Sequence, residues 1–446
     1  KRAVSFMNIG TFHSICYQFL QKQGLNFTLA DEMELFDLAQ EVIRQFGLKI
    51  EPKQFLRLVS LKKTGLKQRN EESSNDTEKL QLKPAYEAYE KLLSEEKIMD
   101  YDDLLMETLR LLKEEKKNEI RKRNFSYLLV DEFQDISPVQ YELIQAWNRK
   151  GRELFAIGDP DQAIYSFRGA DARCFERLKA DYPKLCTIRL KENYRSEPLI
   201  VSGALAVIGK NEGPKRELVP VRENGNPIRL VTASSEMAED IFAAKEINRL
   251  IGGIDMLDSE QHLTDRSEGN IRSFGDIAIL YRTHRQGELL EKCLKKEGIP
   301  YVVAGREDFL TEESVRGTIC FFKYLMNQED RVALRLCLKL LWKLPETSLS
   351  EPAVTSLAQK YLPRLKKERP QKLLLDWMED MEFTGCEPME KLVGMSLFYK
   401  TMPEFLEALV FGGESDLKRC GGKTYTADAV NLMTLHGAKG LEFPVV

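Results

Sequence analysis

Residues 127–135 read YLLVDEFQD, an apolar run that ends in two adjacent carboxylates. This pattern indicates a short strand that delivers Asp131 and Glu132 at its carboxyl end. In open α/β sheets, ligands bind at the carboxyl ends of the strands. In nucleotide hydrolases, one acid at that place holds Mg²⁺ and a second can position or deprotonate the attacking water. An apolar run before Asp-Glu is common, so a strand end without function is the alternative.

A second segment, some twenty residues further on, repeats the pattern of a strand followed by acids. Residues 154–170 read LFAIGDPDQAIYSFRGA. One interpretation is a strand, a proline turn and a helix start with aromatic residues in the core. In the other, Gln162 reaches a terminal phosphate. Tyr165, Phe167 and Arg168 would then offer stacking and charge to single-stranded nucleic acid.

Apolar, β-branched runs alternate with helix-period stretches in residues 126–210 and 228–305. This alternation predicts parallel sheets with crossover helices. The remaining stretches are long, charged and helix-forming, which indicates helical insertions; within the first, Asp31 opens a helix, residues 61–83 form a loop and residues 107–123 form a charged helix. The predicted strands include residues 127–130, 154–157, 186–190, 228–232 and 277–281.

Composition limits the class of protein. The 446 residues include 66 Lys and Arg against 70 Asp and Glu, a net charge of −4, so any polyanion site must be a local basic surface. The eight scattered cysteines form no C-x-x-C pair, and with four histidines they indicate reduced thiols in an intracellular protein. No apolar run of about 18 residues predicts a membrane span. Because the chain begins at Lys1 and stops inside the apolar run LEFPVV, we expect it to be a piece of a longer protein.

Six segments carry a resemblance to a known family. Four of them resemble, in order, motifs II to V of the UvrD/Rep/PcrA family of superfamily 1 DNA helicases: DEFQD at 131–135, GDPDQAIYSFRGAD at 158–171, LKENYRS at 190–196 and MTLHGAKGLEF at 433–443. Residues 10–14, GTFHS, resemble the short DNA-contacting segment that follows motif Ia in the family. Residues 100–105, DYDDLL, resemble a run that the family carries before motif II.

The resemblance implies an α/β fold with two RecA-like parallel-sheet motor domains, each carrying a mainly helical insertion. It implies these bounds: a first motor domain, incomplete at its N-terminus, of residues 1–27 and 126–183, with an insertion at 28–125; and a second, truncated at its C-terminus, of residues 184–325 and 424–446, with an insertion at 326–423.

The resemblance also implies an ATP site between the two motor domains. Asp131 would bind Mg²⁺, and Glu132 would act as the general base. Gln162 would sense the γ-phosphate. Arg195, arriving from the second motor domain, would act as an arginine finger.

Other residues would bind the nucleotide and the DNA. Tyr194 would stack on the adenine, Glu442 would touch the ribose, and Gly440 would belong to the same nucleotide site. His13 and His436 are lone histidines, which are more often structural than ligating. The DNA contacts that the resemblance implies are Thr11, His13, Tyr165, Phe167, Arg168, Thr434, His436 and Lys439.

The sequence departs from the family at several places. The phosphate-binding pattern G-x-x-x-x-G-K-[ST] occurs nowhere, since residues 421–424, GGKT, lack the first glycine, and the chain ends before motif VI. We therefore expect this chain alone to bind ATP poorly and to hydrolyse it hardly at all. Ala163 stands where Ser is usual, Phe167 where Trp is usual and His284 where Asn is usual, and the second insertion is shorter than in the family.

The resulting hypothesis is an ATP-dependent DNA helicase or single-stranded DNA translocase that moves 3′ to 5′. Its ligands would be ATP and Mg²⁺, and its partner would be single-stranded and partly duplex DNA. It would act without a membrane, in the cytoplasm and in association with the nucleoid. Its role would be in DNA repair. One alternative is the helicase subunit of a helicase-nuclease. The other is a non-catalytic DNA-binding scaffold, against which the intact DEFQD, Gln162 and Arg195 argue.

Overall fold

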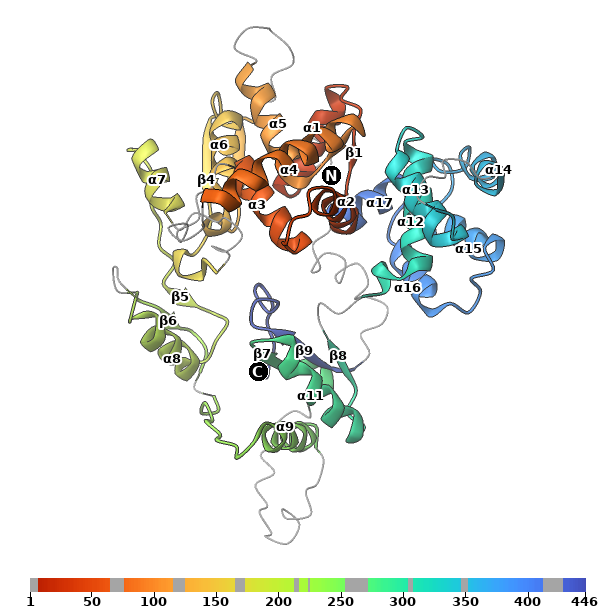
Figure 1. The fold of residues 1–446 in the computed structure, drawn as a ribbon. Coiled ribbons are helices and arrows are strands. Elements are labelled where there is room, and N and C mark those ends of the chain that lie inside the picture. Colours follow the sequence, from red (N-terminus) through yellow and green to blue (C-terminus); the bar gives the residue numbers. More distant parts are fainter. Residues whose placement is uncertain are drawn as a thin grey trace. The chain divides into compact units, whose positions relative to one another are not determined.

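The computed structural model of the chain divides into two compact units, which we describe separately (Figure 1). Unit 1 comprises Lys1–Ile157, Tyr165–Asp171 and Glu307–Tyr425, and unit 2 comprises Gly158–Ile164, Ala172–Arg306 and Thr426–Val446. The structure describes residues 7–64, 76–114, 125–164, 173–211, 216–223, 225–252, 272–303, 308–345, 352–411 and 428–446.

Unit 1 is mainly helical. Its α-helices are α1 (Phe12–Lys22), α2 (Glu32–Gln45), α3 (Pro52–Thr64), α4 (Asp76–Glu95), α5 (Tyr101–Glu114), α6 (Pro138–Trp147), α12 (Glu313–Met326), α13 (Arg331–Trp342), α14 (Pro352–Tyr361), α15 (Pro370–Asp380), α16 (Glu387–Ser396) and α17 (Met402–Phe411). Its strands are β1 (Thr28–Leu29), β2 (Ile98–Met99), β3 (Tyr127–Val130) and β4 (Glu153–Ala156), with short 3₁₀ helices η3 (Phe133–Asp135) and η7 (Asp308–Thr311).

The start of α2 confirms the helix predicted at Asp31. The Asp31 side chain accepts hydrogen bonds from the backbone N–H groups of Met33 and Glu34, at 3.0 and 2.8 Å. The Glu34 side chain accepts in turn from the Asp31 N–H at 2.7 Å. This reciprocal capping box satisfies amide groups that a helix start otherwise leaves without partners.

The loop predicted for residues 61–83 is wrong at both ends. Helix α3 continues to Thr64 and α4 begins at Asp76, while residues 65–75 lie outside the described part of the chain. The polar composition misled because Lys63 is a buried ion-pair partner: its Nζ lies 2.7 Å from Asp100 and 2.9 Å from Asp103. The charged helix predicted for 107–123 is α5, which begins earlier and is described to Glu114.

One hydrophobic core joins two distant parts of the chain. It contains buried residues from α2, α3 and α4, such as Phe55 and Tyr89, together with residues from α12 to α17, such as Phe321 and Trp377. Phe321 and Trp377 stack with their ring centroids 4.2 Å apart. The segments predicted as the two insertions, 28–125 and 326–423, therefore bury apolar faces in one core of unit 1, together with α12, which the prediction had placed in the second motor domain.

Ion pairs reinforce this shared core. Lys323 of α12 lies 2.8 Å from both carboxylate oxygens of Glu34, whose side chain is 1% exposed. Lys97 pairs at the surface with Glu329 at 2.9 Å. Burial opposes the charge on Lys323, but Glu34 and Asp31 outweigh it and raise the lysine pKa above its usual range. Burial in turn raises the pKa of Glu34 to about 7 although Lys323 opposes that shift, so the charge of each residue depends on the other.

A second core in unit 1 packs α1, α5 and α6 around Leu104, Leu143 and Trp147. Strands β3 and β4 are parallel, with Val130 opposite Ala156. The pairing extends past the strands, since the N–H of Ile157 donates to the carbonyl of Val130 at 2.9 Å. These strands confirm the predictions for 127–130 and 154–157, and their carboxyl ends share one edge.

Unit 2 contains a three-stranded parallel sheet in the order β7-β9-β8 and a separate parallel pair, β5 and β6 (Figure 1). Ile247 of α9 and Leu290 of α11 contribute to its core. The elements are η4 (Pro160–Gln162), α7 (Cys174–Asp181), β5 (Glu192–Asn193), α8 (Pro198–Ile208), β6 (Val219–Pro220), α9 (Glu236–Leu250), η6 (Phe274–Asp276), β7 (Ala278–Tyr281), α11 (His284–Lys296), β8 (Tyr301–Val303) and β9 (Val430–Thr434).

Strand β7 confirms the prediction for 277–281, but the strands predicted at 186–190 and 228–232 are wrong. Leu190 and Leu230 are 84% and 97% exposed. A strand requires hydrogen bonds to a neighbouring strand, and no described segment pairs with either of these runs. Parallel strands and helices nevertheless confirm the α/β class. Within the described residues, no helix is long and apolar enough to cross a membrane.

Candidate functional site

Two exposed carboxylates, Asp131 and Glu132, stand at the carboxyl end of β3. Glu132 has φ 49° and ψ 44°, a left-handed conformation that costs a residue other than glycine on the order of 1–3 kcal/mol. The Glu132 N–H donates to the Asp131 carboxylate at 2.9 Å. The side-chain amide of the buried Gln134 donates to the Glu132 carboxylate. A strained backbone therefore presents a carboxylate whose direction a buried side chain sets.

Asp131 fits the site of a magnesium ion that arrives with a phosphate ligand. Mg²⁺ commonly takes one or two protein carboxylates and fills its other positions with water and substrate phosphates. In the described part of the chain, no group of three or more His, Cys, Asp or Glu side chains could hold a metal ion by itself. A single exposed carboxylate at a strand end matches the first arrangement.

The turn that carries Gln162 is held by Asp159. The Asp159 carboxylate accepts from the N–H of Asp161 at 3.0 Å and from the Gln162 side-chain amide at 2.9 Å. Lys439, a residue with a predicted DNA contact, donates from Nζ to the Gln162 backbone carbonyl at 3.0 Å. Arg216 forms ion pairs with both Asp159 and Asp161. Gln162 is therefore oriented by a network that sequence reasoning did not identify.

Asn193, the last residue of β5, positions the backbone of Arg195. Its side-chain oxygen accepts from the N–H groups of Arg195 and Ser196 at 3.1 and 2.8 Å, a turn typical of asparagine. Arg222 donates from Nε to the Tyr194 carbonyl at 3.0 Å. Hydrogen bonds thus hold the backbone around Arg195, whose guanidinium was predicted to act on phosphate.

Tyr194 presents an exposed ring next to Arg195. Its hydroxyl donates to the Glu192 carboxylate, and this hydrogen bond raises the pKa of the phenol. The phenol is therefore anchored at its oxygen while its face remains open. An anchored, exposed aromatic ring is suited to stack on a base.

A tight turn follows β9 and carries the remaining predicted residues of unit 2. The Thr434 hydroxyl accepts from the Gly437 N–H at 3.1 Å. Gly440 has φ +79°, which favours glycine there. His436 and Lys439 lie within this turn, and Glu442 follows it. The turn stands at the carboxyl end of the central strand, where ligands of α/β proteins bind.

Thr11 and His13 stand at the start of α1 in unit 1. Thr11 caps the helix by accepting from the Ser14 N–H at 3.3 Å. The His13 ring meets the edge of Tyr101, with centroids 5.3 Å apart, and burial lowers the pKa of His13 to about 4, against the opposing influence of Asp100. The Tyr101 hydroxyl donates to the Val410 carbonyl at 2.7 Å. The start of α1 is thus connected through Tyr101 to the end of α17.

The structure brings together some of the predicted residues. Unit 1 contains Asp131 and Glu132 as neighbours, and unit 2 joins Arg195 to Glu442 and Lys439 to the carbonyl of Gln162. The predicted DNA contacts Tyr165, Phe167 and Arg168 lie outside the described residues. No sequence pattern marked Arg216, because a single arginine in a charged connection carries no recognisable signal.

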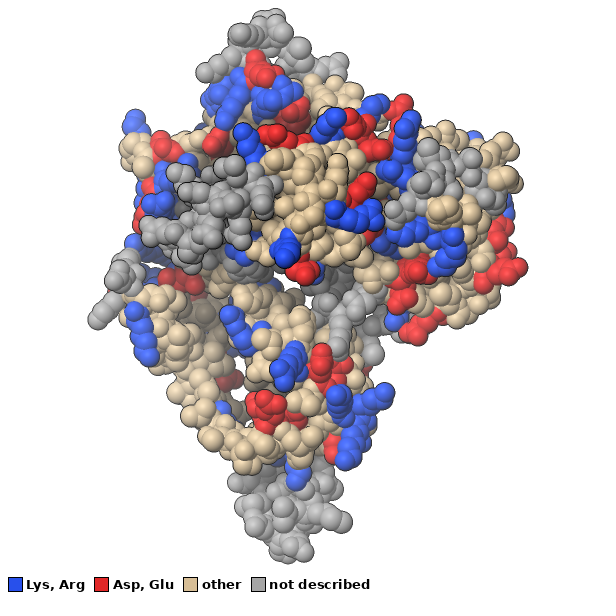
Figure 2. Space-filling model, in the orientation of Figure 1, with Lys and Arg blue, Asp and Glu red and all other residues tan. Residues whose placement is uncertain are grey.

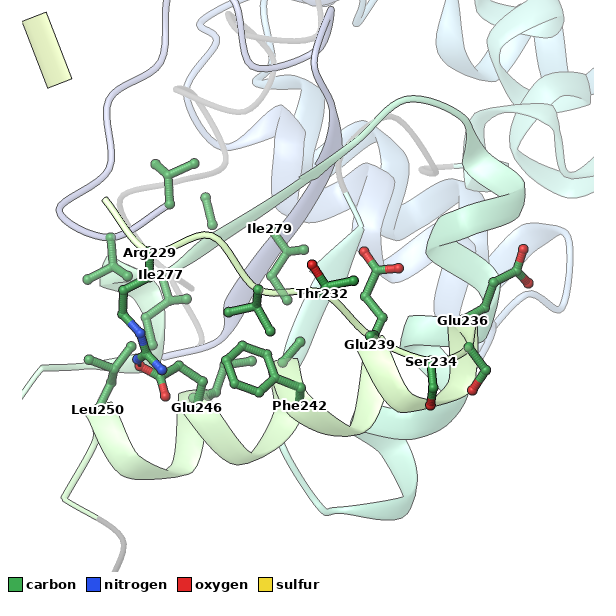
Figure 3. A pocket seen from close by; sticks show the side chains of 18 residues that line it. Arg229, Thr232, Ser234, Glu236, Glu239, Phe242, Glu246, Leu250, Ile277 and Ile279 are labelled. Carbon is green, nitrogen blue, oxygen red and sulfur yellow. Dashed lines mark hydrogen bonds and ion pairs between the residues drawn. The ribbon is translucent and has the colours of Figure 1, made fainter. Parts of the chain in front are cut away.

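Among the described residues, two further surface features are the mixture of charges on one face and a groove in unit 2. On the face shown in Figure 2, basic and acidic side chains are interspersed rather than gathered by sign. A groove of about 690 Å³ in unit 2 lies between α9 and β7 and contains none of the predicted site residues (Figure 3). Apolar side chains such as Phe242 and Ile279 line much of it, and Arg229 pairs there with Glu246.

Comparison with known proteins agrees with this arrangement. Residues 1–183 match the UvrD/REP helicase N-terminal domain, and residues 188–361 match the UvrD-like helicase C-terminal domain. Proteins named ATP-dependent DNA helicase PcrA, from Staphylococcus epidermidis and Staphylococcus aureus, are 26% and 25% identical to the chain over 503 aligned positions. The alignments cover 98% of this chain and 66% of each relative's length. The two matches together confirm the resemblance and the fold class: the chain belongs to the UvrD/Rep helicase family.

Proposed function

We propose that the chain is the motor region of an ATP-dependent DNA helicase or single-stranded DNA translocase that moves 3′ to 5′. The observation that carries the proposal is the pair Asp131 and Glu132, in which a strained residue is held by the buried Gln134. The relatives from Staphylococcus are named as ATP-dependent DNA helicases, which supports the same activity here.

The hydrolytic roles follow from the positions of the charged groups. Bound Mg²⁺ would supply charge neutralisation at the phosphates. Asp131 would hold that ion, and Glu132 would accept a proton from the attacking water. Gln162 would donate its side-chain amide to the terminal phosphate, and Arg195 would stabilise the charge that develops in the transition state. The anchored ring of Tyr194 would stack on the adenine, and the turn with Gly440 and Glu442 would complete the nucleotide contacts.

The DNA contacts would come from both units. Thr434 ends β9, His436 and Lys439 belong to the turn after it, and Thr11 and His13 stand at the start of α1. Tyr165, Phe167 and Arg168 complete this proposed set. Stacking and backbone charge contacts tolerate any base, so we expect little sequence specificity.

The division into two motor domains is part of the proposal. The predicted boundary at residues 183 and 184 agrees with the two family domains, one ending at residue 183 and the other beginning at 188. We propose residues 28–125 and 326–423 as their insertions. Cytoplasmic location and a role in DNA repair belong to the same hypothesis.

The test is ATP hydrolysis stimulated by single-stranded DNA, measured on this chain and on the full-length polypeptide that contains it. We expect turnover in the full-length protein and its loss in the Glu132→Gln variant. Glu142→Gln is the matched control, because Glu142 is a half-exposed acid of unit 1 that pairs with Lys113 and lies outside the proposed site.

The outcomes separate the competing functions. If both lengths bind single strands and neither hydrolyses ATP, the chain is a DNA-binding scaffold and the motor proposal fails. A nuclease activity that depends on a metal and survives Glu132→Gln would instead indicate the helicase subunit of a helicase-nuclease.

A further inference from the structure

Arg216 forms two ion pairs with one turn of the chain. Its Nη2 contacts the Asp159 carboxylate and its Nε contacts the Asp161 carboxylate. The Arg216 side chain is 29% exposed, and the Asp159 and Asp161 side chains are 27% and 33% exposed. A guanidinium binds two carboxylates at once because its donors form a planar, rigid fork.

The turn that pairs with Arg216 also contains Gln162 and orients its side chain. Asp159 accepts from the Gln162 side-chain amide with one carboxylate oxygen, and from Arg216 and the Asp161 N–H with the other. The position of Arg216 therefore bears on the direction of the Gln162 amide through a single shared carboxylate.

On its other side, Arg216 is fixed to the strand pair that leads to Arg195. Strand β6 begins three residues after Arg216 and is parallel to β5, with Val219 opposite Glu192. The Val219 N–H donates to the Lys191 carbonyl at 2.8 Å, and the Val221 N–H donates to the Asn193 carbonyl at 2.9 Å.

The same strand pair then reaches the arginine finger. Asn193 accepts from the Arg195 N–H, and Arg222 donates to the Tyr194 carbonyl. The short stretch from Arg216 to Arg222 is thus bonded at one end to the turn of Gln162 and at the other to the turn of Arg195.

We propose that Arg216 is a positioning residue for ATP hydrolysis, which sets Gln162 and Arg195 in register with each other. This inference rests on the proposed function and deepens it. When Gln162 engages the terminal phosphate, the turn shifts with it. Arg216 carries that shift into β6 and β5, so that Arg195 is placed for the transition state only when the phosphate is sensed.

Ion pairs at or near the surface, such as the partly exposed pairs of Arg216, usually contribute little to stability, about 0–1 kcal/mol. A purely structural Arg216 would therefore change neither folding nor turnover by much, or would change both together. A positioning role makes a different prediction: turnover falls while stability and ATP affinity remain, because misplacement of reacting groups by a fraction of an ångström lowers rate more than binding.

The experiment uses the full-length protein and measures kcat and KM for ATP hydrolysis with saturating single-stranded DNA. For Arg216→Ala we expect kcat to fall about 10- to 100-fold with KM within about threefold of wild type. Arg216→Lys keeps the charge without the fork, so it should recover only part of the rate and serves also if the alanine variant folds poorly. Arg249→Ala is the control, since it removes an arginine that pairs with Glu246 elsewhere in unit 2, away from the turns of Gln162 and Arg195.

A double-mutant cycle adds a second readout. If Arg216 acts through the turn, Asp161→Ala should lower kcat in wild type and have no further effect in Arg216→Ala. Turnover of Arg216→Ala within twofold of the Arg249→Ala control, full recovery by lysine, or losses that simply multiply in the double variant would each overturn the inference. A wild-type protein that hydrolyses no ATP would instead overturn the proposed function, and this inference with it.

Discussion

Arg195 and Glu442 form an ion pair within unit 2, with Nη2 of the arginine 2.5 Å from Oε1 of the glutamate. Both side chains are more than half exposed, so the pair contributes little to stability and is easily exchanged for another partner. The two residues were predicted to act on different parts of one nucleotide, the phosphate and the ribose. In the structure they are partners of each other.

Substitutions of Arg195 and Glu442 should change different kinetic constants of ATP hydrolysis. Arg195→Ala should lower kcat for ATP hydrolysis by about 10³-fold, because an arginine finger acts on the transition state. Glu442→Gln should chiefly raise KM, because a ribose contact is made equally in the ground state and the transition state. Steady-state kinetics of the full-length protein measure both. A fall in kcat for Glu442→Gln as large as that for Arg195→Ala would contradict this assignment.

His13 should make stability depend on pH. Its pKa is lowered in the folded protein from 6.5 to about 4, chiefly by burial, so the unfolded chain takes up a proton at a higher pH than the folded one. Stability should therefore be full above pH 6.5 and fall as the pH drops from 6.5 towards 4. Urea unfolding at several pH values measures this, and His13→Gln should flatten the slope. His284→Gln, at an exposed histidine, is the control substitution.

The buried pair of Lys323 and Glu34 should be costly to break from one side. Lys323→Met leaves an uncompensated carboxylate in the shared core and should destabilise unit 1 by about 3–5 kcal/mol. Lys97→Met, which breaks the exposed pair with Glu329, should cost about 1 kcal/mol or less. Denaturant melts compare the two variants.

The double variant Lys323→Met/Glu34→Gln tests the reason for that cost. Because the amide carries no charge and can still accept from the Asp31 N–H, the double variant should be more stable than Lys323→Met alone. An equally unstable double variant would show that packing, rather than the unpaired charge, sets the cost.

Alanine substitutions at two helix glycines should change the stability of the protein in opposite directions. A Cβ on Gly317 of α12 would lie 2.5 Å from the Leu341 side chain of α13, so Gly317→Ala should destabilise by about 1–3 kcal/mol. Gly394 of α16 has no atom within 4 Å of the same position, so Gly394→Ala should stabilise by up to about 1 kcal/mol. Thermal melts of the two variants provide the comparison, and a stabilised Gly317→Ala would show that the two helices separate freely.

Local signals were sufficient to predict the strands that precede Asp131 and Gln162 and the start of one helix, but not the backbone that precedes Arg195. The strand before Asp131, the strand before the Asp159 turn and the capped start of α2 each depend on a few neighbouring residues, and each was predicted correctly. The strand predictions at 186–190 and 228–232 were wrong. The apolar pattern is present there, but no described segment pairs with either run.

Features that depend on distant residues could not be predicted in this way. The left-handed backbone of Glu132 has no sequence pattern, and the role of Arg216 depends on carboxylates more than fifty positions earlier in the chain. The buried position of Lys63 depends likewise on Asp100 and Asp103. In each case the residue type alone favours a different environment from the one that its partners create.

The core shared by α2–α4 and α12–α17 also has a consequence for biosynthesis. Phe55 leaves the ribosome long before Trp377, and at about 5–20 residues per second the intervening stretch of about 300 residues takes about 15–60 s to make. During that interval the apolar faces of α2, α3 and α4 lack the helices that cover them. The nascent chain therefore depends on slow, long-range closure and is exposed to aggregation or chaperone capture until α12 to α17 have emerged.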